Sequence, residues 1–278
     1  MADYWDPLKY QHEEPTPQCL LRVKKDIAEF TAQPPPRLFI SPEEGDVTKV
    51  HVLMLGAPGS PYEGGFFQFF VKFPPDYPLS PPRVRFLNTD GGRVRFHIHL
   101  YTCGKVCVST LGTAGASTWS PVQSMSSTLI SVQSLLSDNP FYDAMGQERT
   151  KGDADGYNAY IQHETIRVAV CDQVDAALEE HAQCPPAFRK VVLESFLESY
   201  DKYEDVVKAR LHQTGTQLRD TVFGSTTTAQ YETLLTRLQS LRDKIKTKNE
   251  AEAEAAAVAA AAVAAAVEAV TAENEIQQ

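Results

Sequence analysis

Four segments rich in β-branched and aromatic residues follow one another closely in the first third of the chain. They read LFI at 38–40, VTKVHVLML at 47–55, FFQFFVKF at 66–73 and RVRFL at 83–87. Glycine and proline turns separate them. Because consecutive strands joined by short connections tend to pair with each other, the pattern predicts a four-stranded antiparallel meander.

Helical patterns lie on both sides of this predicted sheet. Thr16 can cap a helix that Pro17 begins, and the proline run at 34–36 ends it. The apolar residues of this helix recur at helical spacing, at Leu20, Val23, Ile27 and Phe30. A second helix follows Pro121, with its expected buried face at Val122, Met125, Leu129, Val132 and Leu136. A helix, a meander and further helices predict the α+β class.

From residue 147 onward the periodicity is helical throughout. We therefore predict an N-terminal arm at 1–16, a core domain at 17–146, an all-helical C-terminal extension at 147–249 and an acidic, alanine-rich tail at 250–278. Alanine favours helix, but the tail offers a core little to bury. We expect it to form a frayed helix rather than a folded domain.

Composition limits the partners and the compartment. The 26 basic and 36 acidic side chains give a net charge of −10, which argues against nucleic acid as a partner. Residues 1–10 lack the pattern of a secretory signal, and the apolar run at 255–267 is too short and too rich in alanine to span a bilayer. The five cysteines form no dense framework and indicate free thiols in a reducing compartment. We expect a monomer in the cytoplasm or nucleus, with no membrane partner.

The residues that could carry chemistry gather in an irregular segment at 89–118. Its stretch FHIHLYTCGKVCVSTLG, at 96–112, contains His97, His99, Cys103 and Cys107. These four residues could bind zinc, but the sequence has no second pair of ligands elsewhere, so we expect no metal site. Cys107 could instead be a reactive thiol in a glycine-containing loop, or a small buried residue between two valines. The residues alone leave both interpretations open.

Several motifs occur in a fixed order along the predicted core. They are PYEGGFFQFFVKFPPDYPLSPPRVRF at 61–86, GKVCVSTLG at 104–112, WSPVQSMSSTLISVQSLL at 119–136 and DNP at 138–140. This order resembles the ubiquitin-conjugating enzyme family, and the resemblance covers about residues 17–145. MADYWDPLKY, TPQCLLRVKKDI and YNAYIQHETIRVAVCDQV are similar to one large subtype of that family. The helical region after residue 147 would then be a family-specific extension of the ubiquitin-conjugating (UBC) fold.

The resemblance implies that Cys107 is the nucleophile of an acyltransferase. Its thiol would accept ubiquitin, or a ubiquitin-like modifier, from an activating enzyme as a thioester, and would pass it to a substrate lysine or to a ubiquitin ligase. The implied partners are the modifier, the activating enzyme and the ligases. No cofactor is implied, because ATP is used one step upstream by the activating enzyme. Cys103, four residues earlier, is expected to be a surface or half-buried thiol without a role.

The sequence departs from the family at two places near this cysteine. The family's His-Pro-Asn motif is His97-Ile98-His99 here, so His97 keeps a structural position and His99 stands where the asparagine amide is usual. The acidic gate residue that often follows Asn-Pro comes one place late, at Asp143. These departures leave open a second interpretation, in which the chain is a weakened or inactive UBC-fold protein that binds ubiquitin or ligases.

The family's docking surface transfers to this sequence less sharply. By resemblance it would include Leu79, Pro121 and Val122 in two loops, with Trp119 as a structural residue near the site. On the first helix, the basic side chains that could meet an activating enzyme are Arg22, Lys24 and Lys25. A simple solvated helix face explains these three cations equally well.

Overall fold

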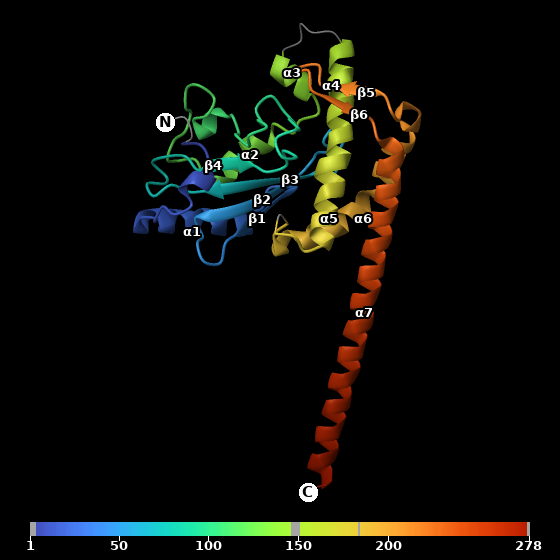
Figure 1. Cartoon of the computed structure of the whole chain (residues 1–278). Helices are drawn as coiled ribbons and strands as arrows, with labels where there is room; N and C mark the ends of the chain where they lie inside the picture. Colours follow the sequence, from blue (N-terminus) through green and yellow to red (C-terminus); the bar gives the residue numbers. More distant parts are fainter. Residues whose placement is uncertain (1–3, 146–150, 183, 277–278) are drawn as a thin grey trace.

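The structure is a computed structural model that describes residues 4–145, 151–182 and 184–276, and the side chains of residues 143–145, 151 and 266–276 lie outside the described part. The four predicted strands form one antiparallel sheet in the order β1-β2-β3-β4 (Figure 1). Their bounds are Leu38–Pro42 for β1, Lys49–Leu55 for β2, Phe66–Lys72 for β3 and Arg83–Phe86 for β4. The predicted meander is confirmed.

Two helices cover one face of this sheet. Helix α1 (Pro17–Ala32) begins where predicted, and Thr16 Oγ1 accepts a hydrogen bond from the Cys19 N–H at 3.1 Å. Helix α2 (Met125–Gln133) starts with a capping box formed by Ser124 and Ser127. Both helices bury apolar side chains against alternate residues of the strands, in a core that includes Val23, Phe30, Val50, Val52, Phe69, Met125 and Leu129.

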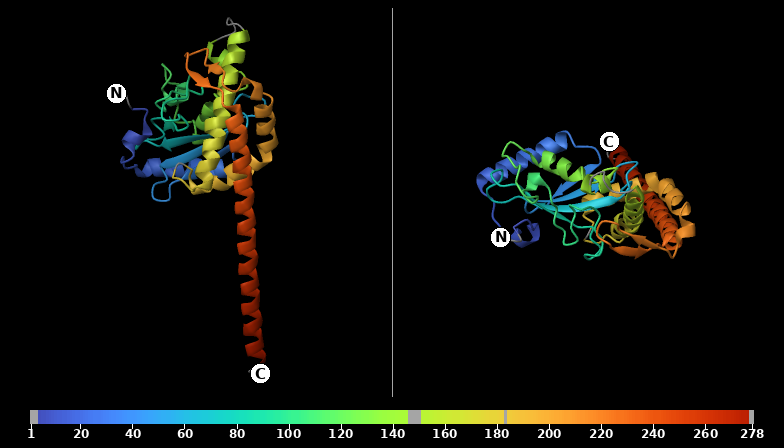
Figure 2. Two further views of the ribbon diagram at one scale, coloured as in Figure 1. Left: turned by 45° about the vertical axis from the view of Figure 1, so that its right-hand side comes forward. Right: turned by 90° about the horizontal axis from the view of Figure 1, so that it is seen from above.

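The C-terminal extension buries the opposite face of the sheet near one end. Helix α4 (Lys151–Glu164) continues through a π-helical segment, η3 (Thr165–Cys171), into α5 (Asp172–Leu178). Helices α6 (Pro186–Lys208) and α7 (Tyr231–Ile276) pack beside them, as Figure 2 shows. Leu53 and Phe66 turn away from the first core and join these helices in a second one, with Val170, Phe196, Tyr203, Leu238 and Ile245. The side-chain alternation of the strands thus joins the extension to the core domain.

The prediction of an all-helical extension needs one correction. Between α6 and α7 the chain forms a 3-10 turn, η4 (Leu211–Gln213), and a hairpin of β5 (Gln217–Arg219) and β6 (Thr226–Thr228). Strands of three residues are too short to show a period of two, so no pattern in the sequence indicated this hairpin.

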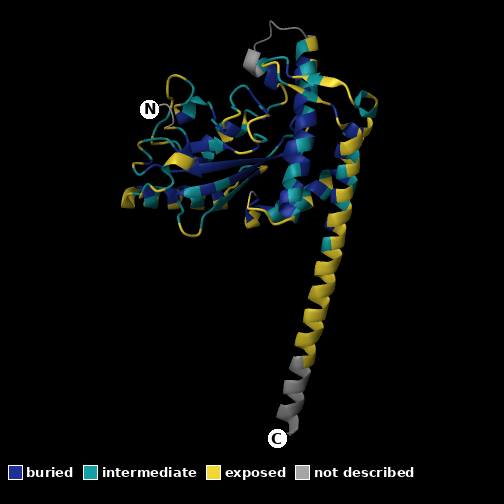
Figure 3. Cartoon of the chain, in the orientation of Figure 1, coloured by how far each residue is buried: buried dark blue, intermediate teal, exposed yellow. Residues whose placement is uncertain are grey.

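Helix α7 runs through the alanine-rich tail without a break. Residues 249–265 are all exposed, as Figure 3 shows. The tail is therefore helical through the intrinsic preference of alanine rather than through packing. No helix in the described part of the chain combines the length and the hydropathy needed to cross a membrane.

The N-terminal arm packs on strand β4 through cation–π contacts and ion pairs. It contains the 3-10 turn η1 (Pro7–Tyr10). The Arg83 guanidinium lies 4.5 Å from the ring centre of Tyr4 and 4.1 Å from that of Tyr10. Arg85 pairs with Asp6 at 2.8 Å. These contacts place Tyr4 and its neighbours beside the irregular segment that carries the predicted nucleophile.

Candidate active site

The loop before Cys107 is attached to the edge strand β4. The Phe86 N–H donates to the Gly104 carbonyl at 2.8 Å, and the backbones of Arg85 and Lys105 form an isolated antiparallel β-bridge. Gly104 has a φ of +92°, and a Cβ there would lie 2.8 Å from the Phe86 carbonyl oxygen, so only glycine fits. The strand therefore fixes the position of the chain three residues before the cysteine.

Cys107 is held at its backbone and at its thiol. Its N–H donates to the His99 carbonyl at 2.9 Å, and its Sγ lies 3.1 Å from the Thr113 carbonyl oxygen. The Thr113 hydroxyl donates to the Val106 carbonyl at 2.7 Å and accepts from the Val108 N–H at 3.0 Å. Because both flanking residues contact Thr113, the segment after the cysteine folds back onto it, near the 3-10 turn η2 (Ser109–Leu111).

Accessibility separates the five free cysteines into two groups. Cys19, Cys171 and Cys184 are buried, and burial raises the pKa of Cys19 to about 11 and that of Cys171 to about 12. Such thiols are neither reachable nor ionised near neutral pH. Cys103 is exposed and Cys107 is half-buried. Only these two can meet a macromolecular partner, and within the described residues no three His, Cys, Asp or Glu side chains gather as a metal ion would require.

His97 is a buried neutral imidazole with a structural contact. Its Nδ1 accepts a hydrogen bond from the His99 N–H at 3.0 Å, and its side chain is 2% exposed. Burial, helped by the charges of His99 and Arg95, lowers the pKa of His97 to about 3. The ring proton therefore sits on Nε2, which has no hydrogen-bond partner among the described residues. The His97 ring thus contacts the backbone of the loop, and its structural role stays a prediction.

Because of His97, the free energy of unfolding is expected to decrease as the pH is lowered from about 6.5 to about 3. In that window the unfolded chain binds a proton that the folded chain excludes, so the contribution of this side chain is complete above 6.5 and is lost toward 3. The loss amounts to about 1.4 kcal/mol per pH unit. The variant His97→Asn keeps an acceptor for the His99 N–H but cannot titrate. The free energy of unfolding, measured with denaturant at several pH values in this window, should depend less steeply on pH in the variant than in the wild type. An equal pH dependence of the two proteins would contradict the assignment.

His99 contacts Cys107 through its backbone carbonyl. Its ring lies 5.3 Å from the His97 ring, centre to centre, and is only partly buried. Partial burial and the nearby Arg95 charge lower the pKa of His99, so its ring is neutral and carries one N–H donor at neutral pH. Asp143 lies in helix α3 (Pro140–Met145), but its side chain lies outside the described residues, so the gate assignment remains a prediction.

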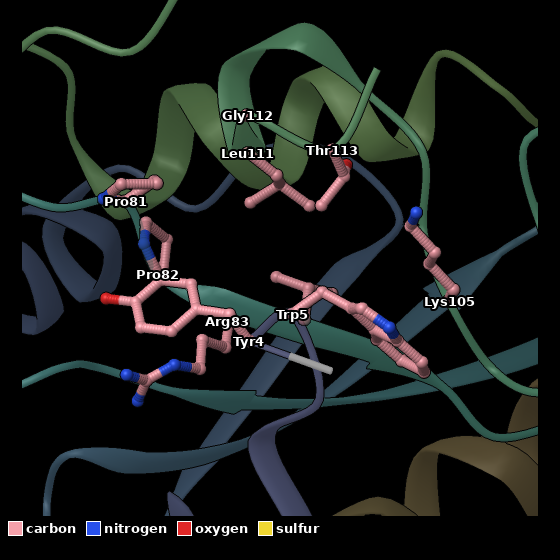
Figure 4. Close-up of a pocket in the computed structure, with 10 residues that line it drawn as sticks. Tyr4, Trp5, Pro81, Pro82, Arg83, Lys105, Leu111, Gly112 and Thr113 are labelled. Carbon is pink, nitrogen blue, oxygen red and sulfur yellow. The ribbon is translucent and has the colours of Figure 1, made fainter. Parts of the chain in front are cut away.

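A cavity of about 320 Å³ opens beside this loop. Figure 4 shows Tyr4 and Trp5 of the arm on one side of it and Leu111 and Thr113 on the other, with Pro81, Pro82 and Lys105 at its ends. Its wall is mainly apolar with cationic groups at the edge. The arm is therefore part of the surface next to the nucleophile.

The two predicted docking loops lie side by side and present apolar residues. Leu79 is 72% exposed and Val122 is 90% exposed, with Pro121 also exposed. The prediction that Val122 belongs to the buried face of the helix is wrong, because α2 begins only at Met125. Trp119 is half-buried, and its Nε1–H donates to the Pro78 carbonyl at 2.9 Å, which joins the two loops.

The three cations of α1 divide into two kinds. Lys24 and Lys25 are exposed, and Lys25 lies 3.7 Å from Glu29. Arg22 is engaged within the chain: its guanidinium donates to the Pro121 carbonyl at 2.8 Å and to the Gln123 carbonyl at 2.5 Å. Arg22 therefore builds the docking loops, while the two lysines remain available to a partner.

Asp26 was missed by the sequence analysis and holds this surface together. It is 1% exposed. Its carboxylate accepts hydrogen bonds from the Arg22 guanidinium at 2.8 Å, from the Met125 N–H at 3.0 Å and from the Tyr77 hydroxyl. It thus joins α1, the first docking loop and the start of α2. The available signal was an acidic residue on the apolar face of a helix, between Val23 and Phe30.

The chain is similar to known proteins over most of its length. Residues 22–164 match the family described as "Ubiquitin-conjugating enzyme". The chain is 45% identical over 253 residues to "Ubiquitin-conjugating enzyme E2 Z" of Xenopus tropicalis, covering 89% of this chain and 80% of the relative. It is 46% identical over 250 residues to the Homo sapiens protein of the same name, covering 88% and 70%. A solved ubiquitin-conjugating enzyme of Plasmodium falciparum aligns at a TM-score of 0.38 and 29% identity, over 42% of this chain and 96% of that one.

Proposed function

The chain belongs to the ubiquitin-conjugating enzyme family, and from that premise we propose that it accepts ubiquitin, or a ubiquitin-like modifier, as a thioester on Cys107 and passes it on. The observation that carries the proposal is the state of this thiol. Of the two accessible cysteines in the described residues, Cys107 is the one whose backbone N–H and Sγ are both held, at 2.9 Å and 3.1 Å. It also lies in the GKVC motif of the matched segment.

The proposed chemistry is an exchange of thioesters followed by attack of an amine. The Cys107 thiolate adds to the carbonyl carbon at the modifier's C-terminus, and the thiol of the activating enzyme leaves. A lysine amine then attacks the new thioester, a carbon–nitrogen bond forms, Cys107 leaves as thiolate and the amine loses a proton. Since a thioester is already reactive toward amines, the protein mainly has to position the groups and stabilise the oxyanion.

Restoring the family's asparagine with His99→Asn is expected to speed transfer to lysine. The amide of asparagine and the imidazole of histidine place their N–H donors at different distances from the backbone. Because one preorganised oxyanion donor is worth roughly 10²–10³-fold in rate, we expect the variant to transfer the modifier at least about tenfold faster. The measurement is the single-turnover decay of the charged protein in free lysine. His12→Asn changes an exposed histidine of the N-terminal arm and is the control. A slower decay in His99→Asn would show that the imidazole itself assists the transfer.

The partners proposed for this site follow from the exposed surface around it. Leu79, Pro121 and Val122 offer the apolar docking loops for the activating enzyme and for ligases, with Lys24 and Lys25 at their edge. We also propose that the protein needs no cofactor of its own, because ATP is used by the activating enzyme. Five free thiols support a reducing compartment, the cytoplasm or nucleus.

A family member that binds ubiquitin or ligases without transferring anything is the second candidate, and His97-Ile98-His99 in place of His-Pro-Asn favours it. One experiment separates the two. The protein is mixed with activating enzyme, ATP and ubiquitin, and its intact mass is measured with and without reductant. A reductant-sensitive adduct heavier by one ubiquitin supports the enzyme. A folded protein that binds ubiquitin but never forms this adduct, with any activating enzyme, supports the second candidate.

A further inference from the structure

Arg95 connects the C-terminal extension to the nucleophile loop. Its guanidinium lies between two aromatic rings, 4.2 Å from the ring centre of Tyr101 and 3.8 Å from that of Phe223. Tyr101 belongs to the loop that precedes Cys107, whereas Phe223 belongs to the turn between β5 and β6. Residues more than a hundred positions apart in the chain thus enclose one cation.

The edge of the same guanidinium fixes the backbone next to the site. It donates to the Ile98 carbonyl at 2.5 Å and to the His97 carbonyl at 3.4 Å. The next carbonyl along the chain, that of His99, accepts the Cys107 N–H at 2.9 Å. The two rings orient the plane of the guanidinium, and this plane determines the direction of its N–H donors. The position of Phe223 therefore affects the 97–99 backbone and, through it, the position of Cys107.

The turn that carries Phe223 has a defined conformation. The buried Asp220 carboxylate accepts the N–H groups of Val222 at 2.8 Å and Phe223 at 3.1 Å. The Thr221 hydroxyl donates to the Asp153 carbonyl in α4 at 2.7 Å. The turn closes at Gly224, whose φ of +78° suits glycine. Two anchors therefore fix the turn on the extension, and the ring of Phe223 projects from it onto Arg95.

The exposure of Phe223 argues against a simple packing role. Its side chain is 40% exposed, and it belongs to neither buried core of the described residues. A large apolar side chain on a surface turn gains little from burial there. The ring instead contacts the Arg95 guanidinium through a cation–π interaction.

We propose that Phe223 and Arg95 are positioning residues, through which the β5–β6 hairpin holds the 97–99 backbone and, through it, Cys107. The extension then contributes to the geometry of the site and is not only a domain attached to the core. The consequence for the transfer rate rests on the proposed function, whereas the effect on the loop does not.

The test compares Phe223→Leu, which keeps an apolar side chain without an aromatic face, with Phe223→Tyr, which keeps the face. The readout is native-state hydrogen exchange of the Cys107 amide and of the Leu100 amide, which donates to the His97 carbonyl at 3.0 Å. We expect exchange roughly 2- to 5-fold faster in Phe223→Leu and wild-type rates in Phe223→Tyr. Arg95→Lys keeps the charge but not the fork, and should accelerate exchange roughly 10-fold. Thr226→Ala, exposed on the same hairpin, is the control.

The same variants are then assayed for discharge of the ubiquitin thioester to free lysine. We expect the discharge rate to decrease most in the variant whose amides exchange fastest, and to stay at the wild-type value in Phe223→Tyr. Exchange that follows this order in a chain that never charges supports the positioning and refutes only the proposed function. Wild-type exchange in Phe223→Leu, or equal acceleration in Phe223→Leu and Phe223→Tyr, overturns the proposal, because the aromatic face on Arg95 would then be irrelevant to the loop.

Discussion

Cys107→Ala is expected to abolish the covalent adduct with ubiquitin completely. Among the described cysteines, Cys107 is the accessible one that the loop holds, through its N–H to the His99 carbonyl at 2.9 Å and through its Sγ to the Thr113 carbonyl at 3.1 Å. None of the three buried cysteines, Cys19, Cys171 and Cys184, can replace it, because each is out of reach and burial raises each pKa to about 11 or 12. The measurement is the intact mass after incubation with activating enzyme, ATP and ubiquitin.

Two further variants make this result specific. Cys107→Ser should trap an oxyester that survives reductant, because a hydroxyl oxygen at the same position forms a bond that thiols do not readily exchange. Cys103→Ala removes the exposed neighbouring thiol and should charge like the wild type. If the adduct is lost in Cys103→Ala and retained in Cys107→Ala, the assignment of the nucleophile is wrong.

Asp26→Ala is expected to destabilise the fold by about 3–5 kcal/mol. The substitution leaves the Tyr77 hydroxyl and the Met125 N–H without their buried acceptor, and it leaves Arg22 without its ion-pair partner at 2.8 Å. These three groups lie in different elements, so the loss loosens α1 from α2 and from the first docking loop. The midpoint of denaturant unfolding, with the slope checked for a two-state transition, measures the effect.

The matched control lies on the same helix. Glu29→Ala removes an acidic side chain that is 56% exposed and 3.7 Å from Lys25, and it should change the free energy of unfolding by no more than about 0.5 kcal/mol. Asp26→Asn keeps one acceptor oxygen and should fall between the two. Equal stability of Asp26→Ala and Glu29→Ala would refute the structural role of Asp26.

Much of the fold was predictable because its signals are local. Strands of four to seven residues with β-branched and aromatic side chains, separated by glycine and proline, indicate a meander without any knowledge of contacts. The cap at Thr16 and the helix that follows are likewise decided within a few positions. The candidate nucleophile, Cys107, was predicted from a motif order that resembles a family. The residues around it left its chemistry open.

The sequence by itself therefore determined the order of the elements and the position of the candidate thiol, whereas only the tertiary structure decided what surrounds that thiol. In the sequence Asp26 is one acidic residue of a helix, and only the fold brings Tyr77 and Met125 to it. Phe223 lies between two short strands that no periodicity indicates, and only the hairpin places it 3.8 Å from Arg95. Both depend on contacts between residues about 50 to 130 positions apart. Contacts at such separation leave no periodicity in the sequence, because they form only when separate elements pack together.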